Sequence, residues 1–157
     1  MSRRSRSREV ALQVLFQDDL NPCDPPTDAA PFLKRRLGKN SSELFDFSIA
    51  LVDGVRMHHA ELDGTIESLA EHWSVARMAT ADRNILRLGV FEMLFLKTPH
   101  RIAIDEAIEL AKRFGGAQSS QFINGVLDRV WHEKKSTISV DINAKEEDTN
   151  KQINNRL

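Results

Sequence analysis

The sequence predicts an all-α protein of about seven helices in a compact bundle. Three observations predict this class. Apolar residues recur at spacings of three and four from Val10 to Trp131, which is the period of amphipathic helices. Residues that cap helices, and glycines or prolines that end them, divide the same stretch into segments of helix length. The alternating residues of segment 138–142 find no second strand to pair with, so a sheet is not expected.

The first two helices are predicted from their ends. Ser5 or Ser7 can cap a helix that Pro22 stops, since proline cannot continue a helix interior. A short second helix is expected over residues 29–37, because Gly38 supplies the usual stop.

The third and fourth helices follow from caps and apolar stripes. Asn40 and Glu43 make a start that resembles a capping box, and an apolar stripe runs on to Val55. Residues 62–73 form a further stripe, with acidic side chains on the opposite face.

The last three helices lie between residues 80 and 131. Thr80 can cap a fifth helix that is apolar nearly all round until Pro99, which predicts a place at the centre of the bundle. A sixth helix is expected to close at Gly115-Gly116, and a seventh to start at Ser119 or Ser120.

Composition bounds the organisation of the chain. Its 157 residues predict one helical domain over residues 1–135, followed by a polar, mobile tail over residues 136–157. The single cysteine, Cys23, closes no internal disulfide, and no run of about 18 apolar residues can span a membrane. We therefore expect a cytoplasmic protein with no membrane segment.

Positive charge gathers at the amino terminus. Four arginines, Arg3, Arg4, Arg6 and Arg8, give residues 1–8 a local charge of +4, which leaves −5 for the rest of a chain whose net charge is −1. Guanidinium groups fork onto phosphates and stack on bases, which favours RNA binding. A solubilising basic tail explains the same charge pattern about equally well.

The residue types needed for catalysis do not assemble into a motif. The five histidines have no metal-ligand spacing, Gly115-Gly116 lacks the strand and glycine pattern of a phosphate loop, and no nucleophile-elbow motif occurs. Glu92, inside the apolar fifth helix, is interpreted as a surface residue or a partner of Arg87. We expect no enzyme activity, no metal and no cofactor.

A second candidate site lies at the start of the seventh helix. The polar residues 118–121 precede a helix amino terminus, whose free N–H groups attract anions. Phe122 either joins the core or stacks on a base, and its spacing favours the core.

Four separated motifs, in order across residues 3–131, resemble the NusB family of bacterial transcription antitermination factors. They are Arg6-Ser7-Arg8-Glu9-x-Ala11-Leu12-Gln13-x-Leu15-Phe16, Asp82-Arg83-x-Ile85-Leu86-Arg87, Ile104-Asp105-Glu106-Ala107-Ile108-Glu109-Leu110-Ala111-Lys112 and Phe122-Ile123-Asn124-Gly125-Val126-Leu127-Asp128.

The resemblance implies two packed helical sub-bundles and a role in transcription. Family members bind the boxA element of nascent ribosomal RNA together with the ribosomal protein NusE, and so help the RNA polymerase elongation complex pass terminators. Position by position, the resemblance assigns RNA binding to Arg3, Arg4, Arg6, Arg8, Gln118, Ser119 and Phe122, and NusE binding to Asp82. It allows a monomer or a homodimer.

Two other interpretations stay open. The domain also resembles the amino-terminal module of some RNA cytosine methyltransferases, although 157 residues leave no room for their catalytic domain. A bundle that binds only proteins, with arginines that aid solubility, is the alternative from another functional class.

Overall fold

The computed structural model describes the backbone of residues 2–154 and the side chains of residues 2–137. That part of the chain forms seven α-helices and one short 3₁₀ turn and contains no strand, which confirms the predicted fold class. The elements are α1 (Arg3–Leu20), α2 (Ala30–Leu37), α3 (Ser42–Met57), α4 (His59–Leu69), the 3₁₀ turn η1 (Val75–Arg77), α5 (Thr80–Leu94), α6 (His100–Phe114) and α7 (Ser119–Asn154).

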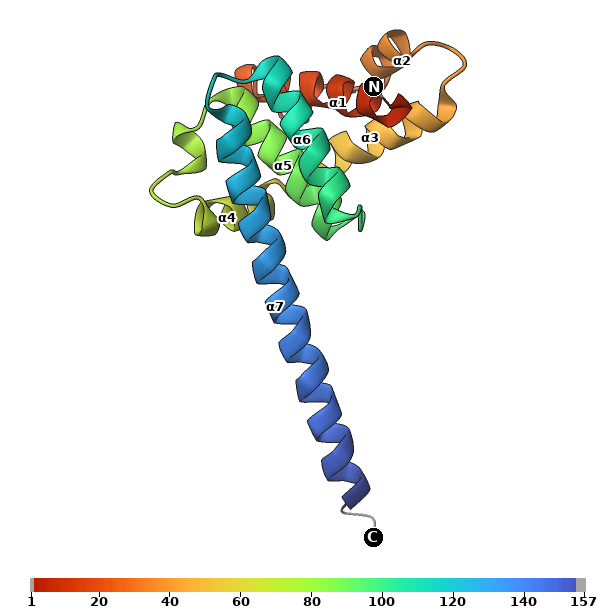
Figure 1. Cartoon of the computed structure of the whole chain (residues 1–157). Helices are drawn as coiled ribbons and strands as arrows, with labels where there is room; N and C mark the ends of the chain where they lie inside the picture. The colour runs from red at the N-terminus through yellow and green to blue at the C-terminus, as the bar shows by residue number, and fades with distance from the viewer. Residues whose placement is uncertain (1, 155–157) are drawn as a thin grey trace.

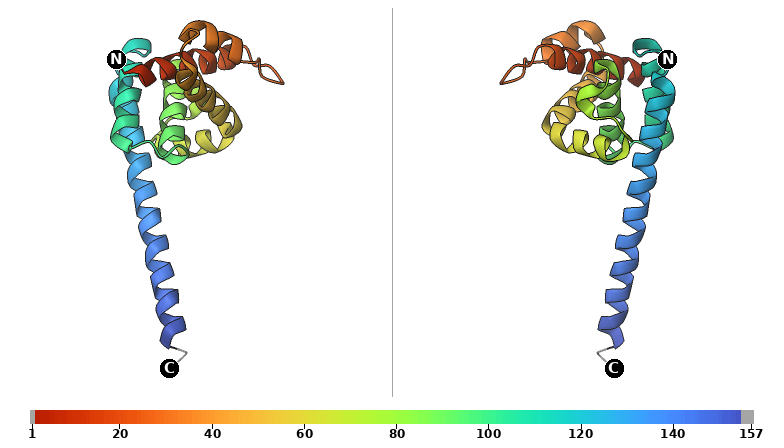
Figure 2. Two further views of the ribbon diagram at one scale, coloured as in Figure 1. Left: turned by 90° about the vertical axis from the view of Figure 1, so that its right-hand side faces the viewer. Right: turned by 90° about the vertical axis from the view of Figure 1, so that its left-hand side faces the viewer.

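The helices pack as two groups around α5. Helices α1, α2 and α3 contact one another at one end of the body, and α4, α6 and the first part of α7 surround the other side of α5 (Figures 1 and 2). Helix α5 also touches α1 and α3, so it joins both groups. Its residues are buried almost continuously from Asn84 to Met93, as expected for a helix that is apolar nearly all round.

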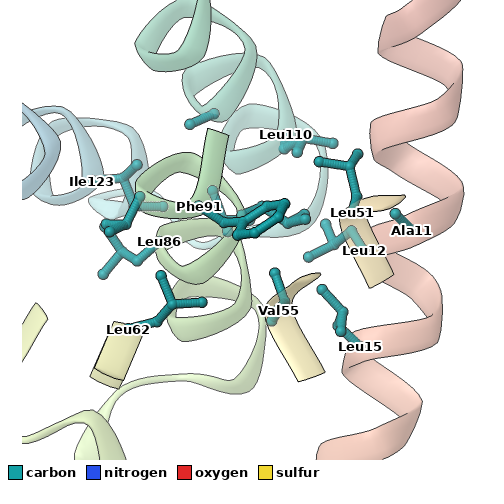
Figure 3. Close-up of a cluster of buried hydrophobic side chains, with 14 of the residues drawn as sticks. Ala11, Leu12, Leu15, Leu51, Val55, Leu62, Leu86, Phe91, Leu110 and Ile123 are labelled. Atoms are coloured by element: carbon teal, nitrogen blue, oxygen red, sulfur yellow. The ribbon is translucent and has the colours of Figure 1, made fainter. Parts of the chain in front are cut away.

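The core is formed by side chains from all seven α-helices. Figure 3 shows the Phe91 ring of α5 between Leu51 and Val55 of α3 and the side chain of Leu86. Gly54 lets α3 approach this ring closely, because an added Cβ at that position meets the ring atoms of Phe91. Close packing of this kind fixes how α3 lies across α5.

Helix α1 begins earlier than the sequence predicts. The cap is Ser2, whose Oγ accepts a hydrogen bond from the Ser5 backbone N–H at 3.1 Å, instead of Ser5 or Ser7. All four amino-terminal arginines therefore lie on a helix, which holds their side chains in fixed directions.

Other helix ends also differ from the predicted ones. Helix α3 starts at Ser42, and no side chain caps it, so the Asn40 capping box does not form. The carboxylate of Glu43 instead lies 3.7 Å from Arg4. Helix α4 ends at Leu69, and the residues that follow turn through His72, which has a positive φ of 65°.

Helix α7 runs to Asn154, well past the body of the protein (Figure 1). No glycine or proline follows Gly125 to stop the helix, although the polarity of residues 136–157 predicts a mobile tail. Mobility of this segment stays a prediction, and residues 155–157 lie outside the described part of the chain.

Candidate nucleic-acid interface

Three of the four amino-terminal arginines lie at the surface of α1. Arg3 is exposed, the side chain of Arg4 is 56% exposed, and that of Arg6 is 38% exposed. Arg4 lies over the Phe47 ring at 4.7 Å, and Arg6 donates to Glu9 at 3.1 Å. These contacts orient the guanidinium groups and leave much of each one open to an anion.

Arg8, one of the predicted RNA contacts, is buried inside the protein. Its side chain is only 5% exposed, and its Nε and Nη2 atoms donate to the Glu92 carboxylate at 2.7–3.0 Å. A second carboxylate, that of Glu106, lies 3.6 Å away. The guanidinium of Arg8 is thus occupied inside the protein, where it ties α1 to α5 and α6.

The same arrangement corrects the interpretation of Glu92. It is 2% exposed and pairs with Arg8, whereas the sequence favoured a surface position or a pair with Arg87. A buried carboxylate needs a cationic partner with good hydrogen-bond geometry. The two residues are 84 positions apart, so only the packed fold brings them together.

Serines fix the start of α1 against its neighbours. The Ser7 hydroxyl donates to the Leu44 carbonyl at 3.0 Å, and the Ser48 hydroxyl donates to the Ser7 carbonyl at 3.0 Å. The Ser5 hydroxyl donates to Glu106 at 2.8 Å. The arginine segment is therefore held on both sides, by α3 and by α6.

Sequence reasoning missed Glu9 and Arg113 as parts of this surface. Glu9 is 3% exposed and accepts from Arg6 and, at 2.9 Å, from Arg113 near the end of α6. A hollow of about 650 Å³ opens beside them, lined also by Ser2 and Ser5. Glu9 and Glu106 stand in the quoted motifs, but the sequence carries no signal that α6 faces α1.

The predicted second stretch lies in the turn between α6 and α7. Gln118 is exposed, and Phe122 is half-buried against the core. Ser119 is 5% exposed, and its Oγ accepts from the Gly116 N–H at 2.8 Å, which fixes the turn. Gln118 and Phe122 are thus accessible to a ligand, while the Ser119 hydroxyl is engaged within the turn.

A second hollow of about 540 Å³ joins this turn to the start of α5. Gln118, Ser119 and Phe122 line it together with Trp73, Arg77 and Asp82. Trp73 is 54% exposed. Two aromatic side chains, one cation and a carboxylate at one opening offer the stacking and hydrogen-bonding groups that an unpaired base uses.

Asp82 does not lie on a surface separate from the predicted RNA contacts. It stands in the first turn of α5 and lines the same hollow as Gln118. Its Oδ1 is buried and has no hydrogen-bond partner among the described residues. An unpaired buried acceptor is costly, so this oxygen is suited to a donor from a ligand.

An ion-pair network holds the start of α5 in place. Asp19 of α1 accepts from Arg83 at 2.7 Å, from the Asn84 amide at 2.8 Å and from Arg87 at 3.0 Å. Burial alone would raise the pKa of Asp19, but the hydrogen bonds from Asn84 and Arg83 and the charge of Arg87 together lower it. Arg87 also forks onto Asp63 of α4.

The described residues contain no group of three or more histidine, cysteine, aspartate or glutamate side chains arranged to hold a metal ion. Within the same residues, no helix has both the length and the apolar character required to cross a bilayer.

Comparison with known proteins identifies the family. The model of the NusB family matches residues 5–132. This chain belongs to the NusB family. The match confirms the resemblance given by the four sequence motifs.

Curated relatives are similar over most of their length. The transcription antitermination protein NusB of Anaeromyxobacter dehalogenans is 43% identical over 129 residues, which cover 82% of this chain and 90% of that protein. The protein of the same name from Desulfitobacterium hafniense is 44% identical over 137 residues, 83% of this chain and 88% of that one.

Solved structures agree with the fold. NusB of T. maritima superposes with a TM-score of 0.70 at 33% identity, covering 83% of this chain and 90% of that one. A crystal structure of the antitermination factors NusB and NusE in complex with double-stranded RNA gives a TM-score of 0.75 at 30% identity, covering 85% and 98%.

Proposed function

We propose that this NusB-family protein is a transcription antitermination factor. It binds boxA-type single-stranded RNA of nascent ribosomal transcripts together with NusE, within the RNA polymerase elongation complex. The observation that carries the proposal is the similarity to NusB as solved with NusE and RNA, which extends over 85% of the chain. The single-stranded form of the RNA rests on the family resemblance and on the open, aromatic hollow.

The exposed arginines supply affinity in this proposal. Arg3, Arg4 and Arg6 contact phosphates, which attract any RNA and carry no sequence information. Arg8 acts indirectly, because its buried pair with Glu92 holds the first turns of α1 against the body.

Sequence preference arises at the second hollow. Phe122 and Trp73 offer ring faces for stacking, and Gln118 and Asp82 offer groups that hydrogen-bond base edges. Because Asp82 lines the same opening, we propose that RNA and NusE meet near this hollow instead of binding on distant faces.

In this proposal, the protein acts by binding and catalyses no reaction. Membership of a transcription-factor family supports this role. The function places the protein in the cytoplasm, with the transcript. Formation of a homodimer stays a prediction.

The test is a titration of fluorescent boxA RNA at several salt concentrations, with and without NusE. Wild type is compared with an Arg3→Gln/Arg4→Gln/Arg6→Gln variant. The salt slope is the decrease of the logarithm of the binding constant with the logarithm of the salt concentration. Loss of three phosphate contacts reduces this slope by about 2, because each contact on a single strand contributes about 0.7.

A matched control removes three exposed cations elsewhere, through Lys97→Gln, Arg101→Gln and Lys134→Gln. An equal loss of affinity in both variants would show that only net charge matters. A pulldown that recovers protein partners equally well after nuclease treatment, from a protein that binds no RNA, would favour the bundle that binds only proteins.

A further inference from the structure

A second group of cations lies on α2 and on the turn that follows it. Lys34, Arg35, Arg36 and Lys39 are all exposed, and the sequence has no acidic residue between Asp28 and Glu43. None of the four takes part in an ion pair recorded for the described residues. The segment therefore carries a local charge of +4 that the fold leaves unneutralised; we call these four residues the α2 patch.

The carboxylates that flank the α2 patch are already engaged. One oxygen of Asp28 accepts from the Ala30 backbone N–H at 3.0 Å, and Glu43 lies 3.7 Å from Arg4. Cations in the last turn of a helix complement its dipole, at about 0.3–1 kcal/mol each. This effect accounts for Lys34, Arg35 and Arg36 within α2 but not for Lys39, which lies beyond the helix.

Two of the cations lie along aromatic rings. The Lys34 Nζ is 5.2 Å from the centre of the Phe45 ring, and the Arg35 guanidinium is 5.8 Å from that of Phe32. Such contacts align the long side chains and leave their charged ends in water. The arrangement repeats that of Arg4 over Phe47.

The α2 patch adjoins the amino-terminal arginines. Lys39 stands four residues before Glu43, and Glu43 contacts Arg4. Helix α2 packs against both α1 and α3, and Figures 1 and 2 show it alongside α1. A polyanion that lies on Arg3 and Arg4 therefore meets the α2 patch next.

We propose that the α2 patch is an additional RNA-binding site, which holds the phosphates of transcript flanking the boxA element. This inference rests on the proposed function. Continuity with the arginines of α1 selects RNA over an acidic protein as the occupant, since one strand can follow both groups of cations. Exposed cations contact phosphates without reading bases, so the site accepts flanking RNA of any sequence.

The test compares a short boxA RNA with the same RNA extended by about ten uridines at its 5′ or its 3′ end. Wild-type protein with NusE should bind one extended RNA three- to tenfold more tightly than the short one. Its salt slope should rise by about 1.4 to 2, which corresponds to two or three phosphate contacts.

The patch variant carries Lys34→Gln, Arg35→Gln, Arg36→Gln and Lys39→Gln. It should bind the short RNA within twofold of wild type and lose the gain from the extension. The control variant, Lys97→Gln/Arg101→Gln/Arg129→Gln/Lys134→Gln, changes the net charge equally at exposed positions outside α2 and should keep that gain. Circular dichroism checks that α2 stays folded.

The outcomes separate the two proposals. Equal gains in wild type and patch variant, or no gain in wild type, overturn the α2 site and leave the proposed function standing. Loss of NusE binding in the patch variant, with the gain intact, assigns the α2 patch to a protein and overturns the RNA assignment. Failure of wild type to bind the short RNA overturns the proposed function and the α2 site with it.

Discussion

The Arg8 guanidinium forks onto the Glu92 carboxylate inside the protein, with three hydrogen bonds of 2.7–3.0 Å. Both side chains are at most 5% exposed. The pair joins the basic first turns of α1 to the central helix α5. An arginine from the basic amino-terminal segment thus serves to anchor the three that remain at the surface.

Removing one member of this pair should be strongly destabilising. Glu92→Gln removes the carboxylate that is hydrogen-bonded to the buried Arg8 and leaves only the more distant Glu106, at 3.6 Å, as its counter-ion; the expected loss of unfolding free energy is about 3–5 kcal/mol. Urea denaturation measures it. The double variant Arg8→Met/Glu92→Met should lose much less, because no unpaired charge remains; an equal loss in both proteins would contradict the assignment.

Gly54 should not tolerate a side chain. A methyl group there meets the Phe91 ring, so Gly54→Ala is expected to cost about 1–3 kcal/mol of stability. Gly64→Ala is the matched control, since an added Cβ at that helical position meets nothing within 4 Å. It should stabilise the protein by up to about 1 kcal/mol. Thermal melting of both variants compares the two effects, and a stable Gly54→Ala protein would refute the close approach of α3 to α5.

The ion-pair network around Asp19 should make the stability of the protein decrease at acidic pH. Because the folded-state pKa of Asp19 is lowered, its contribution is complete above the unfolded-state value of about 3.9. The contribution decreases as the pH falls below that value and is lost once the pH passes the folded-state pKa. Asp19→Asn should lower stability at pH 7 and make the decrease of stability at acidic pH smaller. Denaturation from pH 7 to pH 2 measures both effects. Asp46→Asn, at an exposed position on α3, should leave the profile as in wild type.

Gln118 should contribute to RNA binding without contributing to stability. Its side chain is exposed at the second hollow, so Gln118→Ala removes one hydrogen-bonding group and weakens RNA affinity by about two- to tenfold. Gln121→Ala is the control, since Gln121 is also exposed but does not line the hollow. Anisotropy titrations that find the two variants equally impaired would argue against a role for this opening.

The sequence predicted what depends on local pattern. Seven helices and the central position of α5 follow from apolar periodicity. The partner of Glu92 did not follow, because Arg8 is far away in the sequence and the nearer Arg87 looked equally suitable. The continuation of α7 was missed for a related reason: polarity predicts a tail, but nothing in the sequence breaks the helix.

The sequence predicted which types of residue form the candidate site better than it predicted which of them are exposed. The sequence named Arg8 and Ser119 together with accessible residues, and the structure shows both engaged in internal hydrogen bonds. It also did not indicate that Asp82, assigned to NusE, and Phe122, assigned to RNA, line one hollow. Burial and shared hollows depend on contacts between distant helices, which a single sequence does not display.

Photo-crosslinking tests the central claim most directly. BoxA RNA that carries 4-thiouridine is bound with NusE, irradiated, and the linked peptides are identified by mass spectrometry. The account predicts crosslinks within residues 3–6 and within residues 118–122, around the exposed arginines and the second hollow. Crosslinks absent from both segments, or confined to the far side of α4 or the end of α7, would contradict it.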